Sequence, residues 1–243
     1  MDMIKSGYGD ILGKFSCLND WKLSNVINGE YICDYVYDLT YEMLLKTKDL
    51  GEKLLNRDEA AVKTLMEALI GVGIAMAYVG NSRPASGSEH HLSHFFEVIG
   101  IMKNEPYFMH GTDVAFSAVY TQKLREKLLS LDEPVKAKAF DKKKWENDIK
   151  DIYFEAADGV IELQNRLGWY ERDNSSVIKE KWNEIRCVLS EAPSTQELMS
   201  YLNSIGLDIS EFEKMYGDKK INNAIKYAKD LKDRYSVLWL YNE

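Results

Sequence analysis

The histidines of this chain are confined to one short stretch. All four of them, His90, His91, His94 and His110, lie between positions 90 and 110 of a chain of 243 residues. Imidazole is the commonest metal ligand among side chains, and it exchanges protons near neutral pH. His90 and His94 are four residues apart, so in a helix they would share one face. The spacing therefore indicates a metal-binding or proton-transfer site.

Two imidazoles do not complete a metal site. Catalytic zinc-type sites usually have three protein ligands and one open position. Two histidines with one carboxylate are a common ligand set, which non-haem iron also uses. Among the many carboxylates, Asp10 is distinguished by its neighbours Gly7 and Gly9, because glycine lets a backbone approach closely. Spacing alone does not choose among the carboxylates, so the third ligand stays open at this point.

A polar loop at residues 81–88 precedes the histidines. Ser86 and Glu89 have the spacing of a capping box, which predicts a helix start. Free amides at a helix N-terminus form a natural anion site, and Arg83, Ser86 and Ser88 would add hydrogen-bond donors. An ordinary capped helix with a surface arginine accounts for the same residues, and the sequence leaves both interpretations open.

The segments that must position these residues have mainly helical periodicity in their apolar residues. Apolar residues recur at spacings of three and four within 32–43, 182–189 and 221–231, which is typical of amphipathic helices. Ser194 and Glu197 fit a second capping box. We find no run of alternating apolar and polar residues and no Asn-Gly hairpin signal. The sequence therefore predicts an all-α, multi-helix bundle-like protein.

The interruptions are short and do not divide the chain clearly. They fall at residues 51–52, 80–87, 131–134, 168–176 and 192–193. None is a long linker, so we expect one helical domain over residues 1–243. A C-terminal sub-bundle from about residue 131 is a compatible variant. The apolar stretch 235–241 fits a strand or a helix equally well.

Composition excludes several classes of protein. The net charge of −8 argues against a general nucleic-acid binder. Three widely spaced cysteines, Cys17, Cys33 and Cys187, fit free thiols in a reducing cytosol. The first residues lack the apolar core of a signal peptide. The most apolar stretch, residues 68–79, is too short to span a bilayer and predicts a buried helix. We expect a cytoplasmic protein that binds neither nucleic acid nor membrane.

A series of motifs follows in order along essentially the whole chain. They are Gly9-Asp10-x-x-x-Lys14, Asp20-Trp21-Lys22, Gly73-Ile-Ala-Met-Ala-Tyr78, Asn81-Ser-Arg-Pro-Ala-Ser-Gly-Ser-Glu-His-His-x-x-His94, His110-Gly111 and Asp233-Arg-Tyr-Ser-x-Leu238. This series resembles the sn-glycerol-1-phosphate dehydrogenase family, which belongs with the iron-type alcohol dehydrogenases, glycerol dehydrogenases and dehydroquinate synthases. The run at residues 82–90 is the most specific part of the match.

The resemblance implies a fold, a metal site and a reaction. The fold would be the helical C-terminal half of dehydroquinate synthase-like enzymes. Asp10, His90 and His110 would bind one divalent metal, which is zinc, iron or nickel. Asp10 and His94 would contact the substrate and serve as catalytic residues. The implied reaction is the reduction of dihydroxyacetone phosphate by NADH or NADPH, with the metal polarising the C2 oxygen.

We also expect roles for three further residues, Arg83, Lys14 and His91. The phosphate of the substrate would lie at the turn before His90, assisted by Arg83 and Lys14. His91 would point about 100° away from His90 around the helix. We therefore expect His91 to pack or to support its neighbours rather than to bind the metal.

One departure from the family is large. The family carries an N-terminal nucleotide-binding domain, and this sequence has no glycine-rich turn after a predicted strand. NAD(P) is therefore expected only if a nucleotide-binding domain or subunit is supplied. For the full-length enzyme the resemblance suggests a homo-oligomer. The alternatives are a stand-alone helical metal-binding or interaction module without dehydrogenase activity, and a metal-dependent enzyme of another class such as a non-haem oxygenase.

Overall fold

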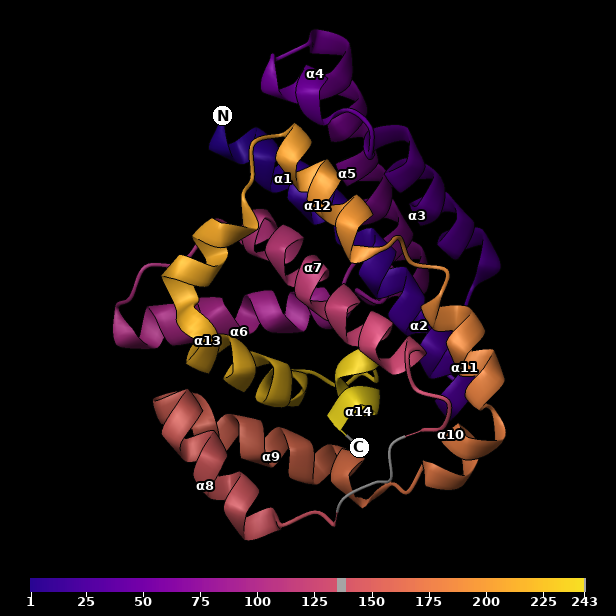
Figure 1. Ribbon diagram of the computed structural model, residues 1–243, viewed down its shortest axis with the longest axis vertical. Coiled ribbons are helices and arrows are strands. Elements are labelled where there is room, and N and C mark those ends of the chain that lie inside the picture. The colour runs from indigo at the N-terminus through magenta and orange to yellow at the C-terminus, as the bar shows by residue number, and fades with distance from the viewer. Residues whose placement is uncertain (135–138, 243) are drawn as a thin grey trace.

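The computed structural model describes residues 1–134 and 139–242, and these residues form helices and no strand (Figure 1). The all-α prediction is confirmed. The helices up to residue 129 are α1 (Asp2–Leu12), α2 (Lys14–Asn28), α3 (Asp34–Thr47), α4 (Gly51–Leu55), α5 (Glu59–Val79), α6 (Ser88–Lys103) and α7 (His110–Leu129). Those from residue 142 onward are α8 (Lys142–Tyr153), η1 (Phe154–Ala156), α9 (Ala157–Leu167), η2 (Trp169–Glu171), α10 (Ser175–Glu180), α11 (Trp182–Leu189), α12 (Thr195–Ser204), α13 (Ile209–Tyr227), η3 (Ala228–Leu231) and α14 (Val237–Asn242).

Helix α7 lies at the centre of the molecule and packs against α1 and α6 (Figure 1). The crossing of α1 and α7 is close because two glycines meet there. A Cβ atom on Gly9 would overlap the carbonyl oxygen of Gly111, and a Cβ atom on Gly111 would overlap that of Ser6. The close approach expected at Gly9 is thus present. It brings the residues next to these glycines, Asp10 and His110, toward each other.

A main apolar core runs through most of the chain, from Tyr8 on α1 to Leu240 on α14. Segments distant in sequence meet in it. The rings of Phe96 on α6 and Tyr216 on α13 stack with their centroids 4.0 Å apart. Burial of such large rings is a principal favourable term in folding. The helices after residue 139 therefore share a core with those that carry the histidines.

The predicted helix starts and ends agree with the structure in part. Ser194 and Glu197 form the capping box expected of them at the start of α12. The box predicted at Ser86 and Glu89 is wrong, because α6 begins at Ser88 and no side chain caps it. The stretch 235–241, which fits a strand or a helix by its pattern, contributes to helix α14. The break expected at 51–52 lies inside the short helix α4.

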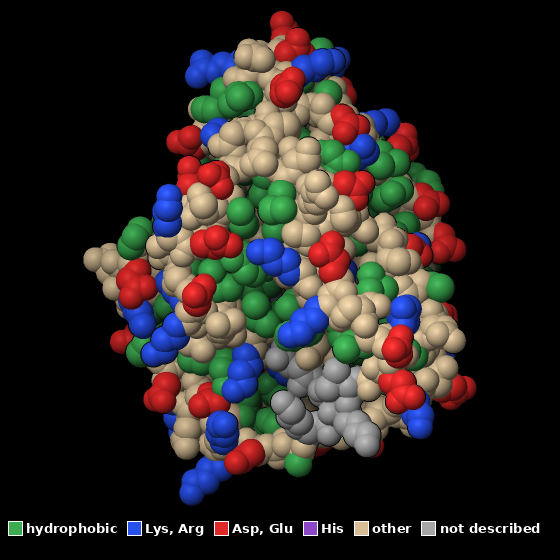
Figure 2. Space-filling view, in the orientation of Figure 1, with side chains coloured by type: hydrophobic (Ala, Val, Ile, Leu, Met, Phe, Trp, Pro, Cys, Tyr) green, Lys and Arg blue, Asp and Glu red, His purple; other side chains and the backbone are tan. Residues whose placement is uncertain are grey.

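Helix α5 differs from the buried helix expected at residues 68–79. It is 21 residues long and packs on α3, but it exposes the apolar side chains of Met66, Ile70, Ile74 and Tyr78. By length and composition α5 is the one helix in the described residues that could cross a membrane; an 18-residue window has a mean hydropathy of 1.6, with 28% of it buried. On the face in Figure 2, acidic and basic side chains are interspersed, with apolar side chains visible between them.

Candidate metal centre

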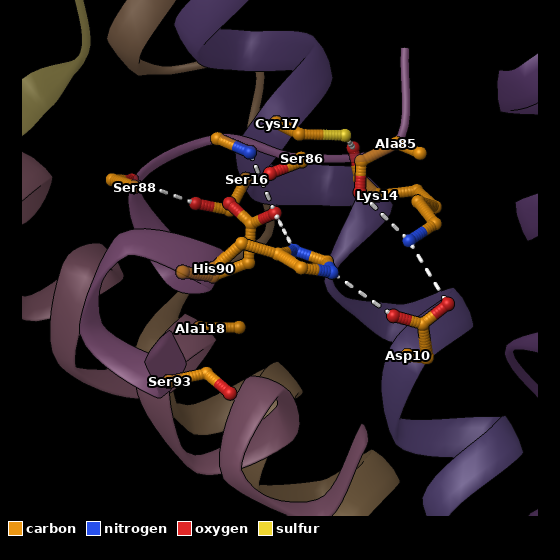
Figure 3. Close-up of polar contacts among 12 residues, drawn as sticks. Asp10, Lys14, Ser16, Cys17, Ala85, Ser86, Ser88, His90, Ser93 and Ala118 are labelled. Carbon is orange, nitrogen blue, oxygen red and sulfur yellow. Dashed lines mark hydrogen bonds and ion pairs between the residues drawn. The ribbon is translucent and has the colours of Figure 1, made fainter. Parts of the chain in front are cut away.

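Three of the residues expected to bind metal converge from three different helices. Asp10 lies near the end of α1, His90 in the first turn of α6, and His110 begins α7. One possible ligand atom from each lies within 4.8 Å of those of the other two. The Oδ1 atom of Asp10 is 3.2 Å from Nε2 of His90 (Figure 3). A carboxylate and two imidazoles at this separation are a donor set that fits a divalent ion.

Lys14 holds the carboxylate of Asp10 in its ionised form. Its ammonium lies 3.2 Å from Oδ2 of Asp10 and donates to the carbonyl oxygen of Ala85 at 2.9 Å (Figure 3). Burial alone would raise the pKa of Asp10, but the Lys14 charge and the hydrogen bond with His90 hold that pKa below its usual range. A carboxylate that stays ionised is suited to bind a cation.

Each of the two imidazoles has a carboxylate near its Nδ1 atom. Nδ1 of His90 is 2.7 Å from Oε1 of Glu89, which is buried. Nδ1 of His110 is 3.8 Å from Oε2 of Glu97. A carboxylate at Nδ1 favours a proton on that atom, so that a metal ion can take the place of the proton on Nε2. In His90, Nε2 faces Oδ1 of Asp10 at 3.2 Å, where a bound metal ion would replace the hydrogen bond between them.

His94 lies beside the same cluster. Its ring centroid is 5.9 Å from that of His90 and 5.3 Å from that of His110. Burial, and then the charge of Lys232, lowers the pKa of His94 to about 3. The imidazole is therefore neutral at pH 7. His94 also forms, with Glu97 and His110, a second group whose possible ligand atoms lie within 4.8 Å of one another.

His91 points away from the cluster into the protein. Its side chain is buried, and its ring nitrogens have no hydrogen-bond partner among the described residues. Burial, and then the charges of Lys232 and Arg234, lowers its pKa well below the usual range. A neutral, buried ring fits the packing role expected of this residue.

The loop before α6 differs from the anion site considered on sequence grounds. The amide of Gly87 donates to Oε1 of Glu89 at 2.9 Å, and the amide of Ser88 donates to Oδ2 of Asp20 at 2.6 Å. Two amides of this helix start are thus already bound by carboxylates of the chain. Arg83 is 2% exposed, so the reading as a surface arginine is wrong.

The contacts of Arg83 lie on the side of Asp20 and the C-terminal segment. Its guanidinium donates to the carbonyl oxygens of Asp20 at 3.0 Å and Tyr235 at 2.8 Å, and it pairs with the carboxylate of Glu30 at 2.9 Å. Two of its nitrogens, Nε and one terminal nitrogen, have no partner among the described residues. Arg83 is thus engaged inside the protein.

Comparison with known proteins relates this arrangement to one kind of enzyme. The glycerol-1-phosphate dehydrogenase [NAD(P)+] of Bacillus licheniformis is 27% identical over 242 residues, which is 100% of this chain and 50% of the relative. That of Geobacillus stearothermophilus is 26% identical over 243 residues, 100% of this chain and 54% of the relative. That of Geobacillus thermodenitrificans is 35% identical over 181 residues, 73% of this chain and 43% of the relative.

The chain is homologous to glycerol-1-phosphate dehydrogenases. It spans about half the length of the curated relatives it matches and corresponds to their C-terminal half. No family model matches the chain. The homology agrees with the resemblance found in the motifs, which run in the same order from Gly9 to Leu238.

Sequence reasoning missed several residues around this candidate metal centre. Glu89 was assigned to a helix cap, although it supports His90, and Glu97 was not considered. The spacing of Glu97 three residues after His94 was a usable signal, because it places both on one face of α6. Arg234 belongs to the closing motif Asp233-Arg-Tyr-Ser-x-Leu238, but neither it nor Lys232 received a role, since the fold brings them to the loop before α6 from more than 140 residues away.

Proposed function

We propose that this chain provides the metal-binding half of an NAD(P)-dependent glycerol-1-phosphate dehydrogenase. In this proposal it reduces dihydroxyacetone phosphate when a nucleotide-binding half is supplied. The observation that carries the proposal is the convergence of Asp10, His90 and His110 from three helices. The full-length homology to glycerol-1-phosphate dehydrogenases supports it. A cytoplasmic location and a homo-oligomer stay predictions from the sequence.

The chemistry follows from this donor set. A bound zinc, iron or nickel ion would act as a Lewis acid on the C2 oxygen of the ketone. Asp10 is kept ionised by Lys14, so it contributes a negative charge to the site. Glu89 favours a proton on Nδ1 of His90, so a bound metal ion would take the place of the proton on Nε2. His94 is neutral, so its imidazole can accept or donate one hydrogen bond to a substrate hydroxyl.

The nicotinamide cofactor is assigned to no residue of this chain. The described residues form no strand, and they therefore contain no strand–turn–helix motif for a dinucleotide. We expect NADH or NADPH to be bound by a second domain or subunit placed next to the cluster. The hydride would reach the substrate from that side.

Metal binding is the first test. The purified chain without a histidine tag is analysed for metal by plasma mass spectrometry and is titrated with zinc, iron(II) and nickel. We expect about one equivalent in the wild type. His110→Ala is the most informative variant, because its side chain is 41% exposed and its removal should leave the fold intact. Glu105→Gln, an exposed carboxylate paired with Lys220, is the control. No metal bound after incubation with each ion would overturn the proposal.

Activity is tested separately. The chain is mixed with a nucleotide-binding half of a homologous dehydrogenase, and NADH oxidation is followed with dihydroxyacetone phosphate. Activity that needs both halves and is lost in His110→Ala supports the proposal. Bound metal without activity under any mixture would favour the alternative, a stand-alone metal-binding or interaction module. The observation that favours this alternative is the exposed apolar side of α5.

A further inference from the structure

Two basic side chains from the C-terminal segment meet the loop that precedes α6. Lys232 and Arg234 lie between η3 and α14, and both are partly buried. Nζ of Lys232 donates to Oγ of Ser86 at 3.0 Å. The guanidinium of Arg234 donates to the carbonyl oxygen of Ser86 and, at 2.9 Å, to Oγ of Ser82. Two cations therefore converge on one short loop.

These two cations differ from their neighbours in having no acidic partner. The other buried cations near the loop are paired with carboxylates at 3.2, 2.9 and 2.8 Å, namely Lys14 with Asp10, Arg83 with Glu30 and Arg125 with Asp20. Over residues 1–134 and 139–242, no ion pair joins Lys232 or Arg234 to a carboxylate.

Burial of an unpaired charge is unfavourable, and the lowered pKa of Lys232 reflects this. Burial, and then the neighbouring charge of Arg234, lowers the pKa of Lys232 to about 8. A buried cation is normally retained where a negative group pairs with it. Glu89 is the acid that acts on both cations, but no ion pair joins its carboxylate to either of them. Its Oε1 atom contacts Nδ1 of His90 and accepts from the amide of Gly87, and its Oε2 atom has no hydrogen-bond partner among the described residues. The pair is therefore arranged for an anion from outside the chain.

The position of this pair relates it to the candidate metal centre. Ser86 lies four residues before His90. The amides of Gly87 and Ser88 already have acceptors, so an anion at this place would be held by side chains. A lysine and an arginine suit phosphate, which forms strong charge-assisted hydrogen bonds with both.

We propose that Lys232 and Arg234, with the hydroxyls of Ser82 and Ser86, bind the phosphate group of a small polyol or ketose phosphate at the loop that precedes α6. The identity of the ligand rests on the proposed function, whereas the presence of an anion site does not. This assignment competes with the expectation that Arg83 and Lys14 assist the phosphate, because both of these are engaged with Glu30 and Asp10.

The test uses the full chain after removal of metal with EDTA, so it does not depend on the metal centre. Inorganic phosphate is titrated by isothermal calorimetry or followed by its phosphorus NMR signal. We expect binding to weaken about ten-fold or more in Lys232→Gln and in Arg234→Gln. Lys219→Gln, an exposed lysine on α13, makes the same charge change as Lys232→Gln and should have no effect. Lys232→Arg should retain binding, and circular dichroism with thermal melts verifies that each variant is folded.

Two further titrations identify the source of the phosphate. Glycerol phosphate should bind at least as well as inorganic phosphate, and glycerol should not bind. Tighter binding of NADP+ that displaces glycerol phosphate would assign the site to the dinucleotide and overturn the proposal. Unchanged phosphate binding in Lys232→Gln and Arg234→Gln would also overturn it. Loss of phosphate binding in Arg83→Ala alone would move the anion to the loop residue expected from the sequence.

These results are separable from the proposed function. Failure to bind phosphate together with one equivalent of bound metal would reject the anion site and leave the metal centre in place. Phosphate binding without metal binding would reject the metal centre and leave the anion site in place.

Discussion

The carboxylate of Asp20 lies 2.8 Å from the guanidinium of Arg125, and both side chains are buried. The same carboxylate accepts the backbone amide of Ser88 at 2.6 Å and that of Val237 at 2.9 Å. One carboxylate on α2 thus joins α7, the start of α6 and the start of α14. It fixes the loop from which both His90 and the proposed anion site are built.

Asp20→Asn should lower the free energy of unfolding by about 3–5 kcal/mol, since it leaves the charge of Arg125 buried without a partner. Urea denaturation followed by circular dichroism measures this. Glu42→Gln is the control, because Glu42 and Lys46 form an exposed i,i+4 pair with side chains 60% and 52% exposed. Its loss should cost less than about 1 kcal/mol. Similar losses in the two variants would contradict the role given to Asp20.

Gly111→Ala should destabilise the protein by about 1–3 kcal/mol or more, because the added methyl group would overlap the carbonyl oxygen of Ser6. The resulting shift of α7 against α1 should also weaken metal binding by moving His110 away from Asp10. Gly73→Ala is the matched control in α5, where nothing lies within 4 Å of the new Cβ atom. It should raise stability by about 0.5–1 kcal/mol. Equal melting temperatures for the two variants would contradict the close crossing.

Glu89→Gln should weaken metal binding about 10–100-fold, because the carboxylate at Nδ1 of His90 orients the ring and increases the basicity of Nε2. Competition with a chromophoric chelator measures the affinity. A cobalt(II) absorption spectrum reports a changed ligand geometry. Glu97→Gln should have a smaller effect, since Oε2 of Glu97 is 3.8 Å from Nδ1 of His110. A larger loss in Glu97→Gln than in Glu89→Gln would reject this assignment.

The ionisation of Asp113 should make a contribution to the free energy of unfolding that falls as the pH rises from about 4 to about 8, opposite in sign to the contribution of His91 and His94, whose low pKa values make stability rise up to about pH 6.5. Burial raises the pKa of Asp113 from 3.8 to about 8, although the hydroxyl of Tyr216 donates to its carboxylate at 2.8 Å. In this range the unfolded chain has lost the proton and the folded chain still holds it. At Asp113 the folded state binds more protons, so this residue's contribution to the free energy of unfolding decreases with pH.

The Asp113→Asn variant isolates this effect. Asparagine cannot ionise, so the urea midpoint of the variant relative to that of the wild type should increase between pH 4 and pH 8. At pH 8 the variant should be at least as stable as the wild type. Glu213→Gln, an exposed acid on α13 that pairs with Lys123 at 3.9 Å, should leave the slope unchanged. Parallel profiles for wild type and Asp113→Asn would exclude Asp113 as the cause.

The sequence predicts what depends on local spacing. The interval of four residues placed His90 and His94 on one helix face, and the apolar periodicity located α3, α11 and α13. At Ser194 the hydroxyl accepts from the amide of Glu197, so the capping box forms as its spacing predicts. At Ser86 the hydroxyl accepts a hydrogen bond from Lys232, and α6 begins two residues later.

The remainder depends on contacts between distant segments, which local patterns do not encode. Asp20, Lys232 and Arg234 acquire their roles only after the C-terminal segment packs against α2 and the loop before α6. The apolar stretch 68–79 was expected to be buried because its composition is that of a core helix. In the fold only one side of α5 faces α3 and α1.

The link between Asp20 and Val237 also has a consequence for protein synthesis. The two residues are separated by 217 positions. At about 5–20 residues per second, a ribosome would add Val237 roughly ten to forty seconds after Asp20. The candidate metal ligands, all within the first 110 residues, would therefore be made well before the segment that fastens their loop. A nascent chain stalled before residue 237 would contain every candidate metal ligand. It would lack the hydrogen bond from the amide of Val237 to Asp20, which helps to fix the position of the loop before α6.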